Sequence, residues 1–336
     1  MALTYLDSCG DTYSVLADRW TVTGSPTIGS SVGRRDTNGI RLTGTGQRLQ
    51  KDVSGLATRT CGVAFKLDTL AATDVLTLRE GTTDHLIVRV TANGAVELLR
   101  APSTQLAISS AGLVVAGFFQ YLEIEATIND STGAYDVDLN GSNVLTGTSA
   151  DTQNGGTGVI DNIEIEGSSG NLTIDDFYIG DTTGSAPQNT RLGDTAVTAV
   201  TTQGDGNTNN WPTLQPASPS THFDKVDDIP PDDDTSYLAS ETSDDLELFD
   251  MQDLPDPGGV SAIYGVQLGL YARKDKTTFR AIKGVTRVGG TNYDGADFTL
   301  TGAYGFGFSL FDDDPDTMAQ WLESGINAAE FGSQVL

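Results

Sequence analysis

Residues 121–128 read Tyr-Leu-Glu-Ile-Glu-Ala-Thr-Ile, and this stretch decides the fold of the first half of the chain. Leu122, Ile124, Ala126 and Ile128 share one face, whereas Glu123, Glu125 and Thr127 share the other. Because successive side chains of a strand point to opposite faces, this alternation predicts a half-buried β-strand. The turn residues 129–133 and the alternating run 135–139 predict its antiparallel partner.

Similar apolar runs extend outward in both directions and end at turn residues. Asn93-Gly94 and Asn140-Gly141 each separate two such runs, and Asn-Gly favours the positive φ angles of a tight hairpin. Short strands divided by turns predict a β-sandwich. In addition to 121–128 and 135–139, the predicted strands of this half are 62–67, 75–79, 85–90, 96–99, 159–166 and 172–179.

A polar segment, Thr182 to Thr190, predicts a linker between two domains, 1–184 and 185–336. The second domain is also expected to be a β-sandwich, so the predicted fold class is all-β with two jelly-roll-like domains in tandem. Its predicted strands include 196–201, 260–273 and 278–287, and residues 316–322 predict one helical turn.

Composition limits the function. The 336 residues include 19 Lys and Arg but 46 Asp and Glu, a formal charge of −27. This charge argues against nucleic-acid binding and against binding to an anionic membrane. The first residues lack the basic and apolar regions of a signal peptide, and the longest apolar stretch, 113–119, is too short to cross a bilayer. We therefore expect a soluble protein made in a cytoplasm.

Two cysteines, Cys9 and Cys61, could form one disulfide or remain as buried free thiols. Without a secretion signal, the second interpretation is favoured.

The sequence offers few catalytic residues. Its two histidines, His85 and His222, lie in different halves, and no nucleophile elbow, Walker loop or zinc spacing is present. Glu123 and Glu125, like Glu164 and Glu166, lie two residues apart, roughly 6–7 Å along a strand. Two carboxyl groups suffice for a glycosidase, but solvent-facing strands commonly carry the same pattern. We predict that the protein is not an enzyme.

Oxygen-rich segments are candidates for Ca²⁺ binding. Asp205, Asn207 and Asn209 resemble the start of an EF-hand loop, but Asn210 replaces its sixth-position glycine and Pro216 its final glutamate. Solvated turns are the alternative interpretation of all these segments. The other candidate ligands are Asp232, Asp234, Asp312 and Asp314.

Trp20, Trp211 and Trp321 are the only tryptophans. Each is expected to lie in a hydrophobic core, and the alternative is a platform that stacks on a sugar.

The stretch 121–141, with its Val137-Asp138-Leu139-Asn140-Gly141 end, resembles a hairpin of the concanavalin A-like/laminin-G jelly roll. Residues 172–179, Leu-Thr-Ile-Asp-Asp-Phe-Tyr-Ile, are similar to the closing strand of that family. The resemblance implies a jelly roll over 1–184. It does not select a function, because this fold serves lectins, hydrolases and plain spacers.

The second half resembles a β domain of phage structural proteins, on residues 226–237, 271–274 and 321–332. The resemblance implies a non-enzymatic structural protein on the virion surface of a tailed phage. A tail appendage or fibre-like attachment protein is the first expectation. A capsid decoration protein (cement or head fibre) and a carbohydrate-binding module are the alternatives. The implied partners are other virion proteins, further copies in a homotrimer and a host-surface glycan, with no nucleic acid and no membrane insertion. No cofactor is expected apart from Ca²⁺.

Overall fold

A computed structural model describes residues 2–35, 37–254, 260–278 and 280–336. The described chain is built almost entirely of antiparallel strands, which confirms the predicted all-β class. It divides into two compact units, Met1–Val197 and Thr198–Leu336. No described helix has the length and apolar character needed to cross a bilayer.

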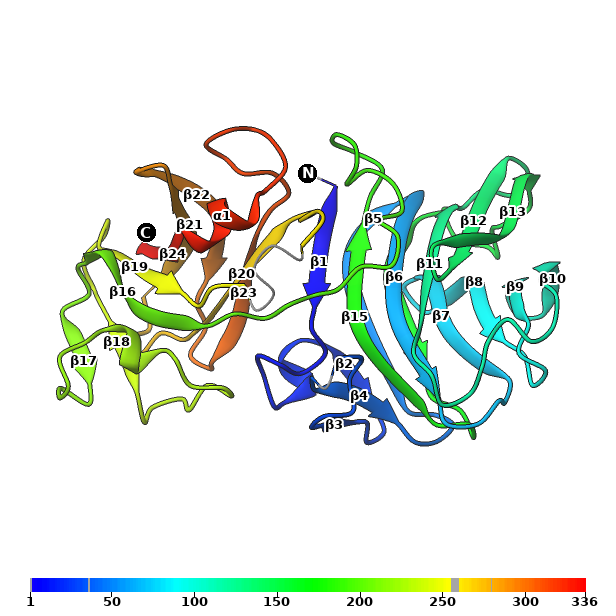
Figure 1. The fold of residues 1–336 in the computed structure, drawn as a ribbon, viewed down its shortest axis with the longest axis horizontal. Coiled ribbons are helices and arrows are strands. Elements are labelled where there is room, and N and C mark those ends of the chain that lie inside the picture. Colours follow the sequence, from blue (N-terminus) through cyan, green and yellow to red (C-terminus); the bar gives the residue numbers. More distant parts are fainter. Residues whose placement is uncertain (1, 36, 255–259, 279) are drawn as a thin grey trace. The chain divides into compact units, whose positions relative to one another are not determined.

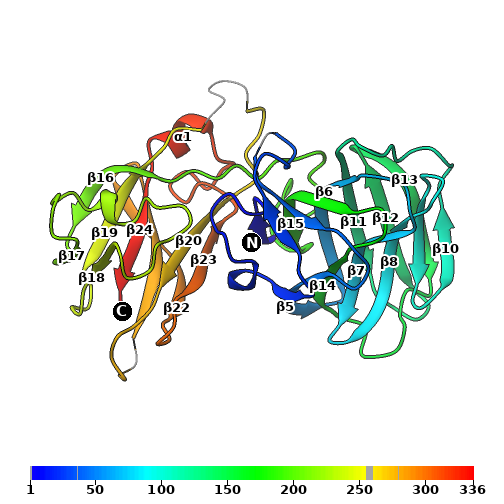
Figure 2. The same ribbon diagram turned by 90° about the horizontal axis from the view of Figure 1, so that it is seen from below.

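The first unit is a sandwich of two sheets, which form separate layers in Figures 1 and 2. One sheet has eight strands. In spatial order they are β13 (Ser142–Ala150), β12 (Gly133–Leu139), β11 (Gln120–Thr127), β6 (Thr58–Leu67), β15 (Leu172–Gly180), β4 (Gly39–Leu42) and β3 (Thr27–Gly29), with β1 (Leu3–Asp7) also paired to β15.

The other sheet of this unit has seven strands. Their order is β10 (Thr104–Ile108), β9 (Val96–Arg100), β8 (Thr83–Val90), β7 (Thr73–Glu80), β14 (Ile160–Glu166), β5 (Arg48–Leu56) and β2 (Thr21–Thr23). A single 3-10 turn, η1 (Leu16–Asp18), is the only helical element described in this unit.

The sequence pattern predicts how these strands pair. Leu122, Ile124 and Ala126 of β11 are buried in the sandwich core, and β11 pairs with β12 in the expected register. The two Asn-Gly turns connect β8 to β9 and β12 to β13, and Asn140 and Gly141 both have positive φ, at 51° and 72°. The apolar face of the strand and the chemistry of the turn therefore specify the same hairpins.

A buried carboxylate stabilises the N-terminal end of the first unit. Asp7 accepts hydrogen bonds from the hydroxyls of Tyr5 and Tyr13, from the indole nitrogen of Trp20 and from the amide of Cys9. A buried charge requires such partners. Trp20 is thus a core residue, as expected, and its ring packs on Phe177 at 5.0 Å between centroids.

The second unit has a five-stranded sheet in the order β16 (Thr202–Asn209), β19 (Leu246–Met251), β24 (Glu330–Val335), β21 (Ala281–Val288) and β22 (Thr291–Thr299). Trp321, Phe331 and Phe311 form its core, together with Val266 and Leu268. The smaller elements are the ribbons β17 (Thr213–Gln215) with β18 (Tyr237–Ala239) and β20 (Val266–Ala272) with β23 (Gly305–Phe311), η2 (Phe223–Lys225) and α1 (Glu323–Asn327).

Four predicted elements of the second half differ from the structure. The helix lies at 323–327 instead of 316–322, because residues 314–319 form a turn with Met318 at a φ of 55° and Asp314 bonded to Ala319. The long strand predicted for 260–273 is shorter, spanning 266–272. Residues 196–201 form no strand. The strand predicted for 278–287 begins at Ala281, and Phe279 lies outside the described residues.

The division between the units falls after Val197, further along the chain than the predicted linker. Residues 188–197, which we call the strap, are hydrogen-bonded to the eight-stranded sheet of the first unit. Polar composition at 182–190 marks a segment without regular secondary structure, and the strap that continues from it is docked on the sheet.

Candidate functional site

Each sheet of the first unit has an outer face, and the two outer faces differ. Residues paired across neighbouring strands point to the same face, so the strand register assigns the side chains. On the eight-stranded sheet, Glu123, Gly62 and Tyr178 form one such row. On the seven-stranded sheet, Gln50, Glu164 and Thr77 form another.

The strap lies across part of the outer face of the eight-stranded sheet, over β11, β12 and β15. The amides of Leu192 and Gly193 donate to Oε1 of Glu123 at 2.8 and 3.0 Å, and the amide of Val197 donates to Asp176 at 2.8 Å. Glu123 is consequently buried, contrary to the expectation that it lies on a solvent-facing strand surface. This part of the face is occupied by the chain itself.

Ion pairs attach both ends of the strap. Arg191 contacts Asp138 at 2.7 Å, Asp136 at 3.5 Å and Glu125 at 3.9 Å. At the other end Arg34 pairs with Asp194 of the strap and with Asp176. One arginine at each end thus offsets the acids that this face carries.

Burial changes the protonation of two carboxyl groups on this face. It raises the pKa of Glu123 to about 7, against hydrogen bonds from Tyr178 and from the strap that favour the charged form. Burial, with the neighbouring charge of Asp176, raises the pKa of Asp175 to about 7. Asp176 has a φ of 48° at a break in the register of β15. The Asp-Asp pair of the 172–179 motif is therefore a bulge that binds the strap and the loop at Arg34.

The outer face of the seven-stranded sheet carries a network of charged side chains that bond to one another. Glu164 accepts from Arg79 and from Gln50, both at 2.7 Å. Arg48 pairs with Glu166 at 3.3 Å and lies 3.9 Å from Glu164. These contacts hold long side chains in fixed positions, and fixed donors and acceptors are what a polar ligand needs. Burial raises the pKa of Glu164, and Arg79 and Arg48 lower it in part.

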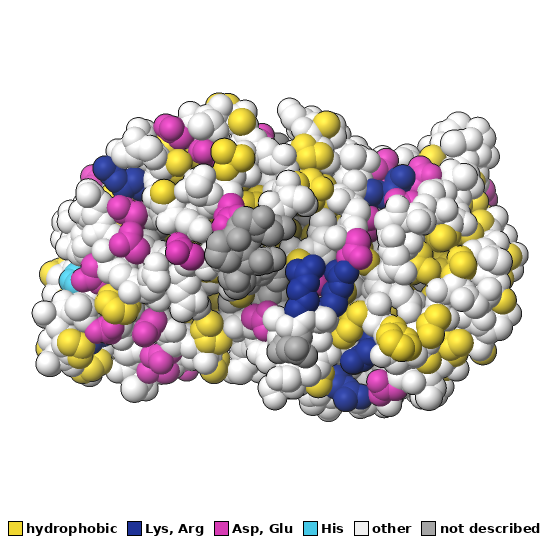
Figure 3. All heavy atoms as spheres, in the orientation of Figure 1, with side chains coloured by type: hydrophobic (Ala, Val, Ile, Leu, Met, Phe, Trp, Pro, Cys, Tyr) yellow, Lys and Arg dark blue, Asp and Glu magenta, His cyan; other side chains and the backbone are white. Residues whose placement is uncertain are grey.

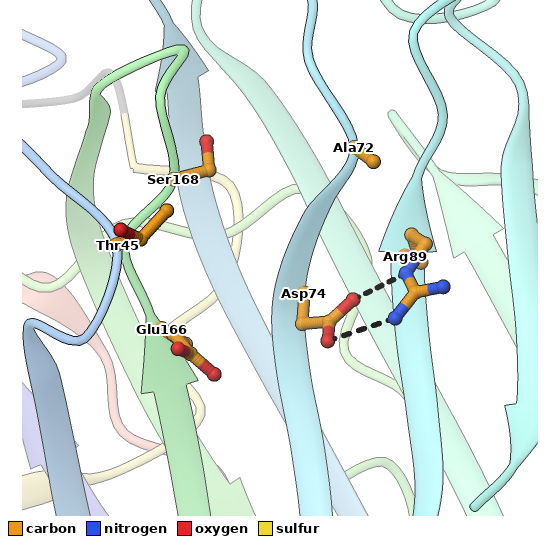
Figure 4. A pocket seen from close by; sticks show the side chains of 7 residues that line it. Thr45, Ala72, Asp74, Arg89, Glu166 and Ser168 are labelled. Atoms are coloured by element: carbon orange, nitrogen blue, oxygen red, sulfur yellow. Dashed lines mark hydrogen bonds and ion pairs between the residues drawn. The ribbon is translucent and has the colours of Figure 1, made fainter. Parts of the chain in front are cut away.

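A pocket of about 290 Å³ opens at one end of this face. Figure 4 shows its side chains: Asp74 and Arg89 project from the neighbouring strands β7 and β8, opposite Glu166 on β14. Arg89 grips Asp74 through Nε and Nη2, at 2.5 and 3.0 Å. The remaining lining residues are Thr45, Ala72, Gly167 and Ser168.

An apolar loop lies at the same end of the sandwich. Phe118 is 67% exposed and Val115 is 51% exposed. The amides of Gly117 and Val114 bond to the carbonyls of Leu67 and Gly94, which follow β6 and β8 at the end where the pocket opens. Exposed aromatic and aliphatic side chains near polar anchors are typical of ligand and partner sites.

The residues predicted to bind Ca²⁺ are used in other contacts. Asp205 accepts from the amides of His222 and Phe223, Asn209 donates to Glu247, and the amide of Asn207 donates to Glu330. Among the described ranges, no three His, Cys, Asp or Glu side chains are grouped closely enough to hold a metal ion.

The remaining aspartates of that prediction lie in turns or ion pairs. Asp232 caps Ser236, Asp234 pairs with Arg273, and Asp314 accepts from the amide of Asp316. Asp312 is partly buried at the end of β23. The solvated-turn interpretation fits Asp234, whereas Asp314 is buried.

The other candidate residues have structural surroundings. His85 is buried and accepts from the amide of Asn154. His222 contacts Glu247 at 2.7 Å. Cys9 and Cys61 are free and buried, as predicted.

Of the tryptophans outside the first unit, Trp321 is in the core, while Trp211 is partly exposed and bonds to Asp245.

Apart from Glu166, which sequence reasoning considered as half of a carboxylate pair, the pocket residues were missed. Asp74 and Arg89 come from facing strands of one hairpin, so the register of 73–90 carries a signal for their pairing. Thr45 and Ser168 come from loops distant in sequence, and no local pattern brings them together.

No family model and no curated protein matches the sequence. Among solved structures, alginate lyase Aly36B is similar, with 14% identity over 54% of this chain and 96% of that one and a TM-score of 0.37. Domain 4 of the arabinanase AbnA from Geobacillus stearothermophilus, in complex with arabinotriose, is similar with 14% identity over 53% of this chain and 93% of that one and a TM-score of 0.35. The CBM40 of the Ruminococcus gnavus IT-sialidase, bound to sialyllactose, is similar with 18% identity over 45% of this chain and 92% of that one and a TM-score of 0.31.

Proposed function

We propose that the first unit is a non-enzymatic carbohydrate-binding module that binds glycans at the pocket on the seven-stranded sheet. The observation that carries the proposal is the contrast between the two outer faces. The strap lies across β11, β12 and β15 on one face, whereas the other face presents a fixed polar network and a pocket at its end. The resemblance of 121–141 and 172–179 to the concanavalin A-like jelly roll, a fold that includes lectins, concerns the fold and does not itself select this function.

The Asp74–Arg89 pair suits sugar hydroxyl groups. The two hydrogen bonds between the side chains use two of the five N–H groups of the guanidinium and two of about four acceptor sites of the carboxylate. The remaining donors and acceptors lie side by side, so one hydroxyl can accept from Arg89 while its neighbour donates to Asp74. The hydroxyl of Thr45 extends this set, whereas the hydroxyl of Ser168 already bonds to Thr73 and Gly170.

Binding without hydrolysis is favoured by the pairing of the carboxylates. Glu164 and Glu166, the two acids nearest the pocket on β14, each pair with an arginine. Each carboxyl is therefore held by an arginine, and neither is placed as an unpaired acid that faces the ligand.

The test is glycan-array binding followed by calorimetry on the strongest ligand. Arg89→Ala and Asp74→Ala should each weaken binding by about tenfold or more, because removing one partner leaves the other unpaired. Arg41→Ala and Asp68→Ala remove a comparable ion pair, 2.8 Å long, on the other sheet and should leave binding unchanged. Equal effects of both sets would contradict the proposal.

Hydrolysis is checked on the same ligand by measuring new reducing ends. The proposal expects none. Cleavage that disappears in Glu164→Gln would replace the binding function with an enzymatic one.

We propose, as a second function, that the whole chain is a structural protein on the surface of a tailed-phage particle. The supporting observation is the resemblance of 226–237, 271–274 and 321–332 to a phage β domain. The charge of −27 suits a crowded exterior, and Figure 3 shows acidic side chains spread over the visible face instead of gathered in one patch.

A tail appendage or fibre-like attachment protein is the first assignment, with a homotrimer as its assembly and a host glycan as its ligand. A capsid decoration protein is the alternative. Imaging purified particles with an antibody against this chain tests the proposal: label on tails or heads supports it, and unlabelled particles contradict it.

A further inference from the structure

We infer that the pocket selects glycans without acidic groups, and rejects uronic acids, sialic acids and sulfated sugars. This inference rests on the proposed glycan-binding function and adds the substrate class. It follows from the charges that surround the pocket on the outer face of the seven-stranded sheet.

The outer face carries more carboxylates than guanidiniums. Strand register and ion pairs assign nine charged side chains to it. They are six acids, Asp52, Asp74, Asp84, Glu97, Glu164 and Glu166, and three arginines, Arg48, Arg79 and Arg89, which gives a formal charge of −3. The net charge of the chain has the same sign. An anionic ligand is therefore repelled both on approach and at the face.

Every arginine of the face already pairs with an acid. Arg89 holds Asp74, Arg79 holds Glu164 and Asp84, and Arg48 holds Glu166. An acidic sugar that bound a guanidinium would displace one of these carboxylates and leave it beside the ligand's own charge. Separating a close ion pair without replacing both partners costs binding free energy.

A neutral sugar avoids this cost. Its hydroxyls use the donors and acceptors that the Asp74–Arg89 pair leaves available, and the pair itself stays intact. Glu166 lies across the pocket from this pair, as Figure 4 shows, and its carboxylate is placed to accept a hydrogen bond from a further hydroxyl. A protonated amino group would also be accepted, since its charge is opposite to that of the face.

The test uses three matched oligosaccharides that differ in the group that carries the charge: a neutral galactose trimer, its galacturonic acid counterpart with carboxylates, and its galactosamine counterpart with amino groups. Glycans that contain mannose, glucose or sialic acid are placed on the same array. Binding is measured at about 20 mM and about 300 mM salt. Acidic members should bind at least tenfold more weakly than their neutral counterparts at low salt, and the gap should narrow at high salt because salt screens the repulsion.

A double variant tests the cause. Asp52→Asn and Glu97→Gln lie on the face but do not line the pocket. Removing these two charges from the face should improve binding of acidic glycans by about threefold at low salt and leave neutral glycans unchanged. Equal gains for both classes would contradict the electrostatic argument.

The outcomes separate the two proposals. Preferential binding of an acidic glycan, lost in Arg89→Ala, would overturn the charge selectivity and keep the glycan-binding function. No binding to any glycan on the array would overturn both.

Discussion

The hydroxyl of Tyr178 donates a 2.6 Å hydrogen bond to Oε1 of Glu123, although β6 lies between the two strands that carry them. Both residues are paired with Gly62 of β6. Since glycine has no side chain, the aromatic ring and the carboxyl meet above the middle strand. The strap then donates two amides to the same oxygen. This contact organises the covered face of the sandwich.

Replacing Glu123 by glutamine should change how stability depends on pH. The pKa of the folded carboxyl, about 7, lies above its ordinary value of 4.5. Between these values the folded chain keeps a proton that the unfolded chain has lost, so the free energy of unfolding falls as the pH rises from about 4.5 to 7. The full loss from this group is on the order of 3 kcal/mol. Glu123→Gln removes it.

Denaturant unfolding at pH 4.5, 5.5, 6.5 and 7.5 measures this effect. The free energy of unfolding of Glu123→Gln minus that of wild type should rise steadily from pH 4.5 to pH 7.5, whatever this difference is at pH 4.5. Asp175→Asn should behave in the same way, because burial and Asp176 raise the pKa of Asp175 to about 7. Parallel curves for wild type and Glu123→Gln would show that the carboxyl is charged throughout.

The strap should loosen when Arg191 is replaced by methionine, which keeps the apolar stem and removes the charge. Three acids of the sheet face then lose their shared partner. A partly exposed ion-pair cluster contributes on the order of 1 kcal/mol, so the amides of Leu192 and Gly193 should exchange with solvent about fivefold faster. Hydrogen exchange read by NMR or mass spectrometry measures this.

Arg41→Met is the control for the strap experiment, because Arg41 pairs with Asp68 on the same sheet without contacting residues 188–197. It should leave the exchange of both strap amides unchanged. Equal protection in Arg191→Met and wild type would mean that the backbone hydrogen bonds to Glu123 and Asp176 hold the strap alone.

Most of the sandwich can be predicted from sequence, because local signals agree there. The alternation of Leu122, Ile124 and Ala126 identifies the buried face of β11, and Asn140-Gly141 identifies its hairpin turn. The burial of Glu123 could not be predicted in this way. It depends on Tyr178 and on Leu192, which are 55 and 69 residues away in sequence.

The candidate site divides along the same line. Asp74 and Arg89 are cross-strand partners in one hairpin, so a correct prediction of the strand register over 73–90 would have placed them side by side. The rest of the pocket depends on how loops at 45, 72 and 166–168 meet at one end of the sandwich. The local periodicity of the sequence carries no information about contacts between loops that are distant in sequence. The acidic segments at 205–209 and 232–234 were conspicuous in sequence, but the structure uses them to cap turns and pair strands.

The two cysteines should be inert in the folded protein. Burial raises the pKa of Cys61 to about 12 and raises that of Cys9 well above its ordinary value. Because the thiolate is the reactive form, neither should react measurably with Ellman's reagent at pH 8 within an hour, and both should react after unfolding in guanidinium. Ser131→Cys, in an exposed turn, is the positive control and should add one rapidly reacting thiol. Reaction of two thiols before unfolding would show that the N-terminal end of the sandwich opens.

Gly62 should tolerate no side chain. A Cβ at this position would lie 2.1 Å from Cε1 of Tyr178 and 2.8 Å from the hydroxyl of Tyr121. Both rings are buried, so the clash needs movement of the sheet or the strap. We expect Gly62→Ala to lower the free energy of unfolding by about 1–3 kcal/mol, the usual cost of overpacking.

Gly44 provides the matched control, because a Cβ there meets no atom within 4 Å. Gly44→Ala should change stability by less than about 0.5 kcal/mol. The cause is tested by a double-mutant cycle in denaturant: with Tyr178→Ala as the background, the ring is gone and Gly62→Ala should cost much less. If the cost of Gly62→Ala is the same in both backgrounds, the clash with Tyr178 is not what requires glycine, and the contact between Tyr178 and Glu123 does not depend on the bare strand beneath it.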